Sequence, residues 1–184
     1  VHLKSDLEID RIRTSCRIAA EAMLRVAEEL KPGVTTLHLD QIADQHIRSQ
    51  GAVASALGYR GFPRSICISI NEEVVHGIPS ERVHSANLLD ATRQSLEQGL
   101  AACEPGKRLG DVGHAIQSYV EERGYSIVRE YCGHGIGRSF HEDPQLLHYG
   151  VAGTGRRLQA GMVFTIEPMV NEGVADTRVL DDDW

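Results

Sequence analysis

The hydrophobic positions in the first part of the chain recur at helical spacing. Between residues 6 and 30, apolar side chains stand three or four positions apart, so they share one face of a predicted helix. These positions are Ile9, Ile12, Cys16, Ala19, Met23, Val26 and Leu30. Asp6 is the predicted N-cap, and the run Lys31-Pro32-Gly33 ends the helix because proline cannot continue it. The pattern therefore predicts an amphipathic helix with one face turned toward a core.

The same periodicity predicts three more helices, at residues 37–50, 88–100 and 111–123. Thr35 or Thr36 is expected to cap the first of these and Asp111 the last, because short polar side chains accept hydrogen bonds from the first turn of a helix. The period changes to two, with many β-branched residues, in the predicted strands at residues 65–70, 126–130 and 161–167. The chain is therefore predicted to be α+β.

An internal repeat accompanies this order of elements. A helix is predicted before Pro32-Gly33 and another before Pro105-Gly106. The glycine that closes the next helix, Gly51 or Gly124, stands nineteen positions after the proline in both cases. A shift of 73 residues aligns the core positions of the two parts. Helix–turn–helix pairs are common, so chance similarity is the alternative to duplication. Duplication predicts two α+β halves whose strands meet in a central sheet with helices on one side.

Length and composition restrict the class of protein. The 184 residues suffice for a domain with a real core, and the 41% hydrophobic content is ordinary for a globular protein. A net charge of −7 and the lack of a nucleic-acid motif do not indicate a nucleic-acid-binding surface. The four cysteines form no C-x-x-C pair, which favours free thiols in a reducing compartment. No apolar run approaches a membrane span and no signal-peptide core is present, so a cytoplasmic protein is predicted.

Four side chains are candidates for chemistry. His134 and His141 stand seven residues apart in the glycine-rich run of residues 130–144, Glu167 ends an apolar run, and His76 precedes a glycine. Imidazole nitrogens and carboxylate oxygens bind divalent metals, and a spare imidazole can donate a hydrogen bond to a developing oxyanion. Spacing alone leaves two interpretations open, a hydrolytic metal site and a structural loop whose histidines lie in turns.

Six stretches, taken in chain order, resemble the motifs of the type I methionine aminopeptidases. They are Gly58-Tyr-Arg-Gly-Phe-Pro63, Ser69-Ile-Asn71, His76-Gly-Ile-Pro79, Glu130-Tyr-Cys-Gly-His-Gly-Ile-Gly-Arg138, Phe140-His-Glu142 and Thr165-Ile-Glu-Pro-Met169. The resemblance covers nearly the whole chain. It implies the α+β pita-bread fold, with two pseudo-symmetric halves, a central antiparallel sheet and flanking helices. One domain over residues 1–184 is implied, with halves of about 1–87 and 88–184 and the site between them.

The resemblance also implies a role for each candidate residue. His134 and Glu167 match metal ligands, and Glu167 also matches the carboxylate that activates the bridging water. His141 matches the histidine that steadies the tetrahedral intermediate, and His76 the one that contacts the scissile amide. Five residues match the lining of the methionine pocket, for which ordinary core packing is the alternative: Tyr59, Phe62, Cys67, Phe140 and Trp184.

The implied function is that of a metal-dependent aminopeptidase that removes the initiator methionine from nascent proteins. The family holds two divalent ions per site, of cobalt, manganese, iron or zinc. The implied partners are the N-terminal methionine of nascent peptides and the ribosome, and the implied state is a monomer. An enzyme like prolidase or aminopeptidase P, on the same fold, is a further alternative, against which the run Cys132-Gly-His-Gly-Ile-Gly137 speaks.

The chain departs from the family in its metal ligands. The family uses two aspartates, one histidine and two glutamates, but here residues 80–87 lead directly into the helix predicted from Leu88, without the aspartate-bearing stretch. The sequence also stops at Trp184, before the family's last glutamate. Either the residues are a subset of a longer active enzyme, or the chain is a degenerate relative that binds a protein or ribosomal partner. With only His134 and Glu167 as ligands, we expect the 184 residues to release little methionine.

Overall fold

The computed structural model describes residues 1–31, 33–70, 73–82 and 89–179. Trp184 and the predicted boundary between the halves at residues 87 and 88 lie outside the described residues. The chain forms two compact units, one of Val1–Ile9 with Ala86–Arg178, the other of Asp10–Ser85 with Val179–Trp184. The sequence pattern did not indicate that the first nine residues belong with the later part of the chain.

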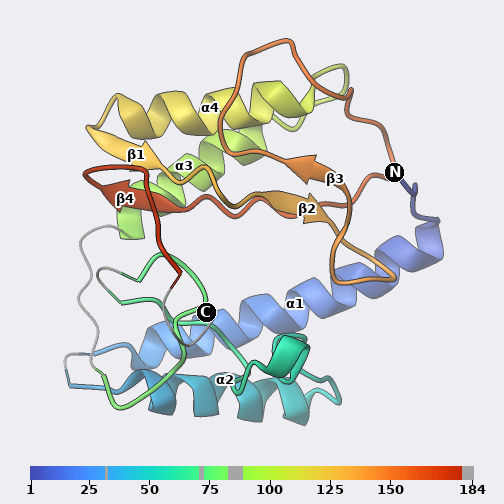
Figure 1. The fold of residues 1–184 in the computed structure, drawn as a ribbon. Helices are drawn as coiled ribbons and strands as arrows, with labels where there is room; N and C mark the ends of the chain where they lie inside the picture. Colours follow the sequence, from blue (N-terminus) through green and yellow to red (C-terminus); the bar gives the residue numbers. More distant parts are fainter. Residues whose placement is uncertain (32, 71–72, 83–88, 180–184) are drawn as a thin grey trace. The chain divides into compact units, whose positions relative to one another are not determined.

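In the described part of the unit that begins at Asp10, the regular elements are two helices and a 3-10 turn. α1 (Asp6–Glu29) starts in the other unit and continues into this one, and it is followed by α2 (Thr36–Ser49) and η1 (Tyr59–Gly61) (Figure 1). The helices pack through a small core in which apolar side chains from each remove one another from water. The buried members are Ala22, Val26, Leu39 and Ala43.

The caps of these helices correct one prediction and decide another. Asp6 is the first residue of α1, not its cap. Ser5 takes that place, because the Ser5 N–H donates to the Glu8 carboxylate at 2.9 Å while the Glu8 N–H lies 3.4 Å from Ser5 Oγ. Of the two candidates for α2, Thr35 is the cap, and its hydroxyl accepts from the His38 N–H at 3.2 Å.

The other unit places two helices against short strands. Its elements are α3 (Leu89–Ala101), α4 (Leu109–Glu121), β1 (Tyr125–Ile127), β2 (Gly133–Gly135), β3 (Glu142–Leu146) and β4 (Val170–Glu172). The strands form two antiparallel pairs, β1 with β4 and β2 with β3. The pairing of β2 with β3 shifts register between His134 and Gly135. Among the described residues the strands thus form two short antiparallel pairs, and His134 lies in the middle of β2.

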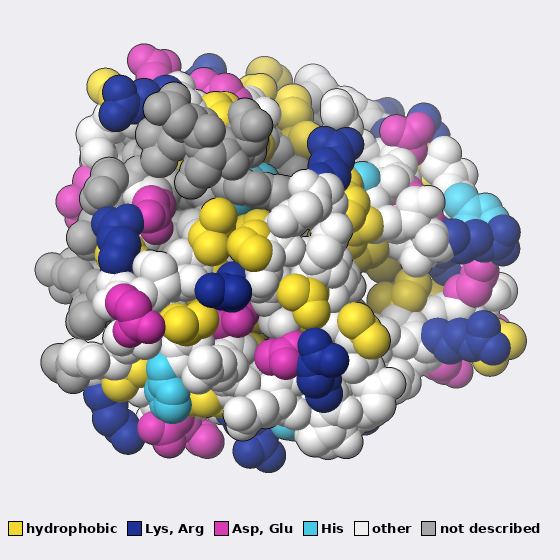
Figure 2. Space-filling view, turned by 60° about the horizontal axis from the view of Figure 1, so that its bottom comes forward, with side chains coloured by type: hydrophobic (Ala, Val, Ile, Leu, Met, Phe, Trp, Pro, Cys, Tyr) yellow, Lys and Arg dark blue, Asp and Glu magenta, His cyan; other side chains and the backbone are white. Residues whose placement is uncertain are grey.

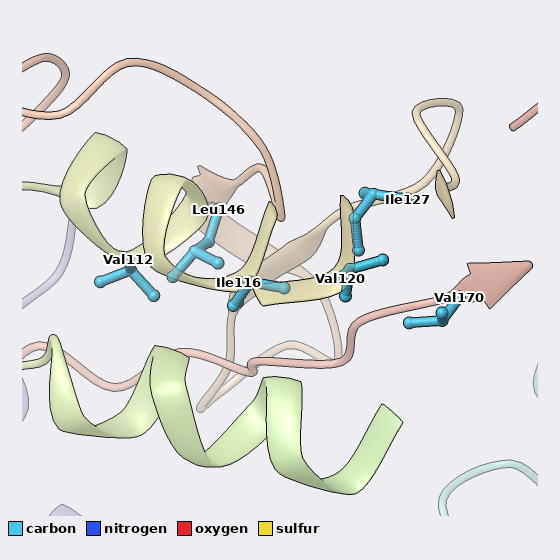
Figure 3. Packing of buried hydrophobic residues seen from close by; sticks show 6 residues of the cluster. All are labelled: Val112, Ile116, Val120, Ile127, Leu146 and Val170. Atoms are coloured by element: carbon cyan, nitrogen blue, oxygen red, sulfur yellow. The ribbon is translucent and has the colours of Figure 1, made fainter. Parts of the chain in front are cut away.

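The core of this unit lies between α4 and the strands. Val112, Ile116 and Val120 stand at helical spacing on one face of α4. They pack against Ile127 of β1, Leu146 of β3 and Val170 of β4 (Figure 3). All six side chains are buried, so this cluster fixes both strand pairs against one helix.

The predicted cap of α4 also requires correction. Asp111 is the third residue of the helix, and its carboxylate accepts from the backbone N–H of Arg108 at 2.7 Å and from that of Gly153 at 2.6 Å. These hydrogen bonds, with Gly153 first, hold the pKa of Asp111 below its usual value. The carboxylate therefore stabilises the helix start and the loop around Gly153 together.

Two of the three predicted strands are not regular strands. Residues 65–70 form no strand, although the Ile68 N–H donates to the Gly77 carbonyl at 2.9 Å. Residues 161–167 contribute only an isolated bridge between Phe164 and Gly135. The prediction at residues 126–130 corresponds to β1, which begins one residue earlier and ends at Ile127. Alternating side chains identify a half-buried extended run, but a strand also needs a backbone partner along its length.

Equivalent turns follow the sequence repeat. Gly33 and Gly106 have φ of 90° and 88°, and Gly51 and Gly124 have φ of 71° and 77°. All four lie in the left-handed region that glycine adopts without a steric penalty. α2 begins at Thr36 and α4 at Leu109, which is the same shift of 73 residues. The local backbone thus follows the repeat, whereas the similarity of the two halves in space stays a prediction.

The described surface carries both signs of charge. On the face shown in Figure 2, acidic and basic side chains are interspersed with small groups of hydrophobic ones. None of the helices among the described residues is both long and apolar enough to cross a membrane.

Candidate active site

β2 carries His134 between two glycines that allow close backbone contacts. A Cβ on Gly133 would lie 2.3 Å from the Thr165 carbonyl oxygen, and one on Gly135 would lie 2.3 Å from the Asp143 carbonyl oxygen. The His134 N–H donates to Thr165 Oγ1 at 3.0 Å, and the Thr165 N–H donates to the His134 carbonyl at 2.8 Å. Gly133 therefore allows the segment around Thr165 to lie directly against β2, and Gly135 allows Asp143 to do the same.

The His134 side chain faces the Glu167 carboxylate. His134 Nε2 lies 3.4 Å from Glu167 Oε1, with the histidine side chain 14% exposed and the glutamate side chain 44% exposed. His134 Nδ1 lies 2.9 Å from the Gly135 carbonyl oxygen, and because a carbonyl only accepts hydrogen bonds, Nδ1 donates in this contact while Nε2 faces the carboxylate. The Thr165 hydroxyl donates to Glu167 Oε1 at 2.6 Å. Both side chains are thus oriented by their neighbours.

His141 and Phe140 complete an aromatic cluster around His134. The His141 ring centroid lies 4.2 Å from that of His134 and 4.8 Å from that of Phe140. Phe140 in turn lies edge-on to His134, with 6.1 Å between the centroids. The structure therefore brings together three of the residues predicted for chemistry, His134, His141 and Glu167, with one residue of the predicted pocket.

His148 is a member of the site that sequence reasoning missed. Its side chain is buried, and its Nε2 accepts a hydrogen bond from the Glu167 backbone N–H at 3.0 Å. Burial lowers the pKa of His148 to about 4, which keeps the ring neutral and able to accept that bond. Nothing in the run Leu147-His148-Tyr149 indicates such a contact, because it joins residues that are 19 positions apart.

Cys132 also lies within the electrostatic influence of Glu167. Burial raises the pKa of the Cys132 thiol first, and the negative charge of Glu167 raises it further. The thiol is therefore disfavoured as a thiolate ligand or nucleophile, even though it precedes the Gly-His-Gly run by one position.

The remaining predicted residues belong to the other compact unit. His76 has φ of 55°, a left-handed conformation that is uncommon for histidine. Tyr59 is the first residue of η1, and Phe62, which follows that turn, is 3% exposed. Cys67 is exposed. Their placement in the methionine pocket and the role of His76 stay predictions, and Trp184 lies outside the described residues.

The histidine–glutamate pair fits one metal ion but not two. With ligand bonds of about 2.1 Å, two ligands at a tetrahedral angle stand about 3.4 Å apart. The Nε2–Oε1 separation of 3.4 Å equals that value. Over the described ranges, however, no three His, Cys, Asp or Glu side chains are grouped closely enough to hold a metal. The pair is therefore an incomplete site, and it does not fit the binuclear centre that the resemblance implies.

The fold and the site together define a class, the pita-bread metallopeptidases. The structure of the Rickettsia prowazekii methionine aminopeptidase superposes with a TM-score of 0.93 at 36% identity, over 100% of this chain and 88% of that one. The Thermotoga maritima methionine aminopeptidase gives 0.94 at 32% identity, again over 100% and 88%. The prolidase of Pyrococcus horikoshii, at 21% identity and a TM-score of 0.66 over 90% of this chain and 55% of that one, shares the fold.

This chain belongs to metallopeptidase family M24, whose model matches residues 10–86 and 83–182. Methionine aminopeptidase 1 of Bacillus subtilis is 42% identical over 98% of this chain and 86% of its own length. Methionine aminopeptidase A of Synechocystis is 40% identical, over 100% of this chain and 86% of that protein. The predicted family and fold class are confirmed.

The comparisons also locate the interruption in the sequence. The Synechocystis alignment runs over 218 residues although this chain has 184, so the relative contains residues without a counterpart here. The family model matches in two pieces that meet at residues 83–86. This is the region in which the aspartate-bearing stretch is expected from the family resemblance. Among the described residues, no third ligand is grouped with His134 and Glu167.

Proposed function

We propose that this protein is a metal-dependent aminopeptidase that acts on the N-terminal methionine of peptides. The observation that carries the proposal is the meeting of His134, His141 and Glu167, with 3.4 Å between the histidine nitrogen and the carboxylate oxygen. The support from comparison is identity of about 40% to proteins named methionine aminopeptidase. We also propose that it acts in the cytoplasm as a monomer on nascent chains.

Each residue has a distinct part in this proposal. His134 and Glu167 would hold a divalent ion such as cobalt, manganese, iron or zinc, and such an ion would supply a nucleophile at neutral pH and polarise the scissile carbonyl. His141, beside His134, donates a hydrogen bond toward the oxyanion. His148 holds the Glu167 backbone in place by accepting a hydrogen bond from its N–H. The family resemblance assigns the contact with the scissile amide to His76 and the lining of the methionine pocket to Tyr59, Phe62, Cys67, Phe140 and Trp184.

The number of ligands limits what these 184 residues can do. One imidazole and one carboxylate hold an ion weakly and leave most of its coordination to water. We therefore expect weak metal binding and little turnover from this chain. Restoring the interrupted stretch is expected to raise both, because it supplies the two aspartates that the family resemblance assigns to the site.

Release of free methionine from a Met-Ala-Ser peptide tests this proposal. The assay compares the 184-residue chain with a restored variant, each against increasing cobalt or manganese. The restored variant carries the aligned stretch of the Bacillus subtilis relative between Asn87 and Leu88 and, after Trp184, the C-terminal residues of that relative, so that the two aspartates and the last glutamate are all present. The restored variant is expected to release methionine from the peptide. The substitution His134→Ala in the restored variant is expected to abolish this release. Failure of a folded restored variant at every metal concentration contradicts the proposal, and robust turnover by the 184-residue chain contradicts the ligand count.

A second candidate function is suggested by the lack of a third metal ligand in the described part of the chain. A relative that keeps the fold without a complete metal site is suited to binding a protein or ribosomal partner instead of cleaving one. Cosedimentation with ribosomes, compared between the 184-residue chain and the restored variant, tests this alternative. Equal binding by both with no turnover from either favours the binding function.

A further inference from the structure

The first nine residues lie beside the loop that joins β2 to β3 (Figure 1). The Lys4 N–H donates to the Gly161 carbonyl at 2.8 Å, and Lys4 Nζ lies 2.5 Å from Glu142 Oε2. Arg138 donates to Glu8 Oε1 through Nε at 3.0 Å and through Nη2 at 2.9 Å. The segment therefore contacts the loop that carries His141 as well as the start of the run that leads to Glu167.

Lys4 is not a solvated surface lysine. Its side chain is 2% exposed, while that of Glu142 is 17% exposed. A Cβ on Gly137 would lie 2.4 Å from Lys4 Cε, so glycine at that position leaves the space that the lysine stem occupies. A buried ammonium group requires a charged partner, and removing one member of such a pair leaves the other unpaired. The contact between Lys4 and Glu142 is thus a built feature of the fold.

Glu142, the first residue of β3, anchors the end of the loop that joins β2 to β3. Its second oxygen, Oε1, accepts from the Ser139 N–H at 3.0 Å, while Oε2 accepts from Lys4. These contacts, with Lys4 first and Ser139 second, lower the pKa of Glu142 to about 2, so the carboxylate is ionised at neutral pH. At the near end, Glu8 holds Arg138. Phe140 and His141 stand between these two anchored positions.

We infer that Lys4 and Glu8 are positioning residues that hold the loop of residues 138–142 so that His141 stays against His134. The catalytic meaning of His141 rests on the proposed function, whereas the contacts themselves do not. An imidazole that must meet a developing charge has to be held by neighbours whose own positions are fixed. The N-terminal segment supplies that support from outside the strand pair, through one buried and one partly exposed ion pair.

Fluorine NMR of the full chain labelled with fluorophenylalanine tests this inference. The protein has three phenylalanines, at positions 62, 140 and 164, so three signals are expected, and Phe140→Leu assigns the one of interest. Lys4→Met keeps the apolar stem without the charge, and Glu142→Gln keeps the shape of its partner. Arg13→Met is the matched control, because it breaks an exposed pair with Asp10 one turn further along α1.

The Phe140 signal is expected to move toward its position in the unfolded chain in Lys4→Met, in Glu142→Gln and in Glu8→Gln, and to stay in place in Arg13→Met. The Phe62 signal is expected to stay in place in all four. The double variant Lys4→Met/Glu142→Gln is expected to shift the signal no further than either single change, since both remove one contact. Line widths of the remaining signals and far-ultraviolet circular dichroism show whether each variant is folded.

If the Phe140 signal does not move in the folded variants Lys4→Met and Glu8→Gln, the inference is overturned. This holds even if the melting temperature of these variants falls, because the ion pairs would then stabilise the fold without holding the loop of residues 138–142 in position. In the variant with the restored stretch, Lys4→Met is expected to lower kcat by more than tenfold with little change in KM. If the restored variant releases no methionine at all, the proposed function fails while the fluorine result still decides the positioning role.

Discussion

At the scale of single residues, the position of His134 depends on the glycines beside it. The Thr165 carbonyl lies so close to Gly133 in space that no side chain fits between them. The same approach places Glu167 opposite the imidazole, since Thr165 bonds both the His134 backbone and the Glu167 carboxylate. The absence of a side chain at residue 133 is therefore as important to the site as the imidazole at residue 134.

Gly133→Ala is expected to destabilise the protein by about 3 kcal/mol, because its Cβ would stand 2.3 Å from a backbone oxygen that belongs to a different segment. Gly51→Ala is the control. Its φ of 71° is strained for alanine, but no atom lies within 4 Å, so a loss of about 1 kcal/mol is expected. Urea unfolding measures both. Equal losses would contradict the close approach of residues 133 and 165.

At the scale of elements, residues 65–70 show how much a strand depends on its neighbours. The run alternates as predicted, and its amides bond in several directions: Ile66 to Asp40, Ile68 to Gly77 and Ile70 to Glu73. The chain passes from residue 79 to α3 without the stretch that its relatives contain. Among the described residues, the backbone hydrogen bonds of the run are limited to Ile68 with Gly77 and Ile70 with Glu73, which do not form a ladder.

Inserting the aligned stretch of the Bacillus subtilis relative between Asn87 and Leu88 is expected to convert residues 65–70 into a regular strand, because the insertion supplies backbone partners along the run. Hydrogen exchange followed by NMR checks this, with slower exchange expected for the amides of residues 66–70 and little change in α4. An inserted glycine–serine linker of the same length is the control. Unchanged exchange in the restored variant would show that the run is extended for another reason.

At the scale of the whole molecule, the repeat relates the two helix pairs. The starts of α2 and α4 and the left-handed glycines that frame them recur at one shift, and the buried residues Leu39 and Val112 are equivalent under it. Because the turns and the buried positions are equally spaced in the two helix pairs, equivalent side chains pack in the core of each pair. Duplication accounts for this with one ancestral unit.

Superposing residues 15–51 on residues 88–124 in a crystal structure of the chain is expected to overlay both helices of each pair. The reason is that the same turn geometry and the same core spacing fix the crossing of each helix pair. The control is a superposition displaced by one helical turn, which is expected to fit distinctly worse. Unrelated helix directions at the shift of 73 residues would contradict duplication.

The candidate site was partly predictable from the sequence. His134, His141 and Glu167 were identified by residue type and by resemblance, and the structure brings them together. His148 and Lys4 were missed, because each acts through a contact with a residue far along the chain and neither belongs to a recognisable local pattern. The metal-binding and catalytic roles stay predictions until ion binding and turnover are measured.

The order of helices, the left-handed turns and the apolar face of each helix follow from the sequence, since helical spacing, caps and glycine conformations are local properties. The interruption before Leu88, and with it the shortage of metal ligands, can also be read from the residues. Strand pairing, the meeting of His134 with Glu167, and the anchoring of the His141 loop by Lys4 and Glu8 were decided by the tertiary structure alone. Each of these joins segments that are distant along the chain, and hydrogen bonds and ion pairs of that kind exist only once the backbone has brought both partners into place.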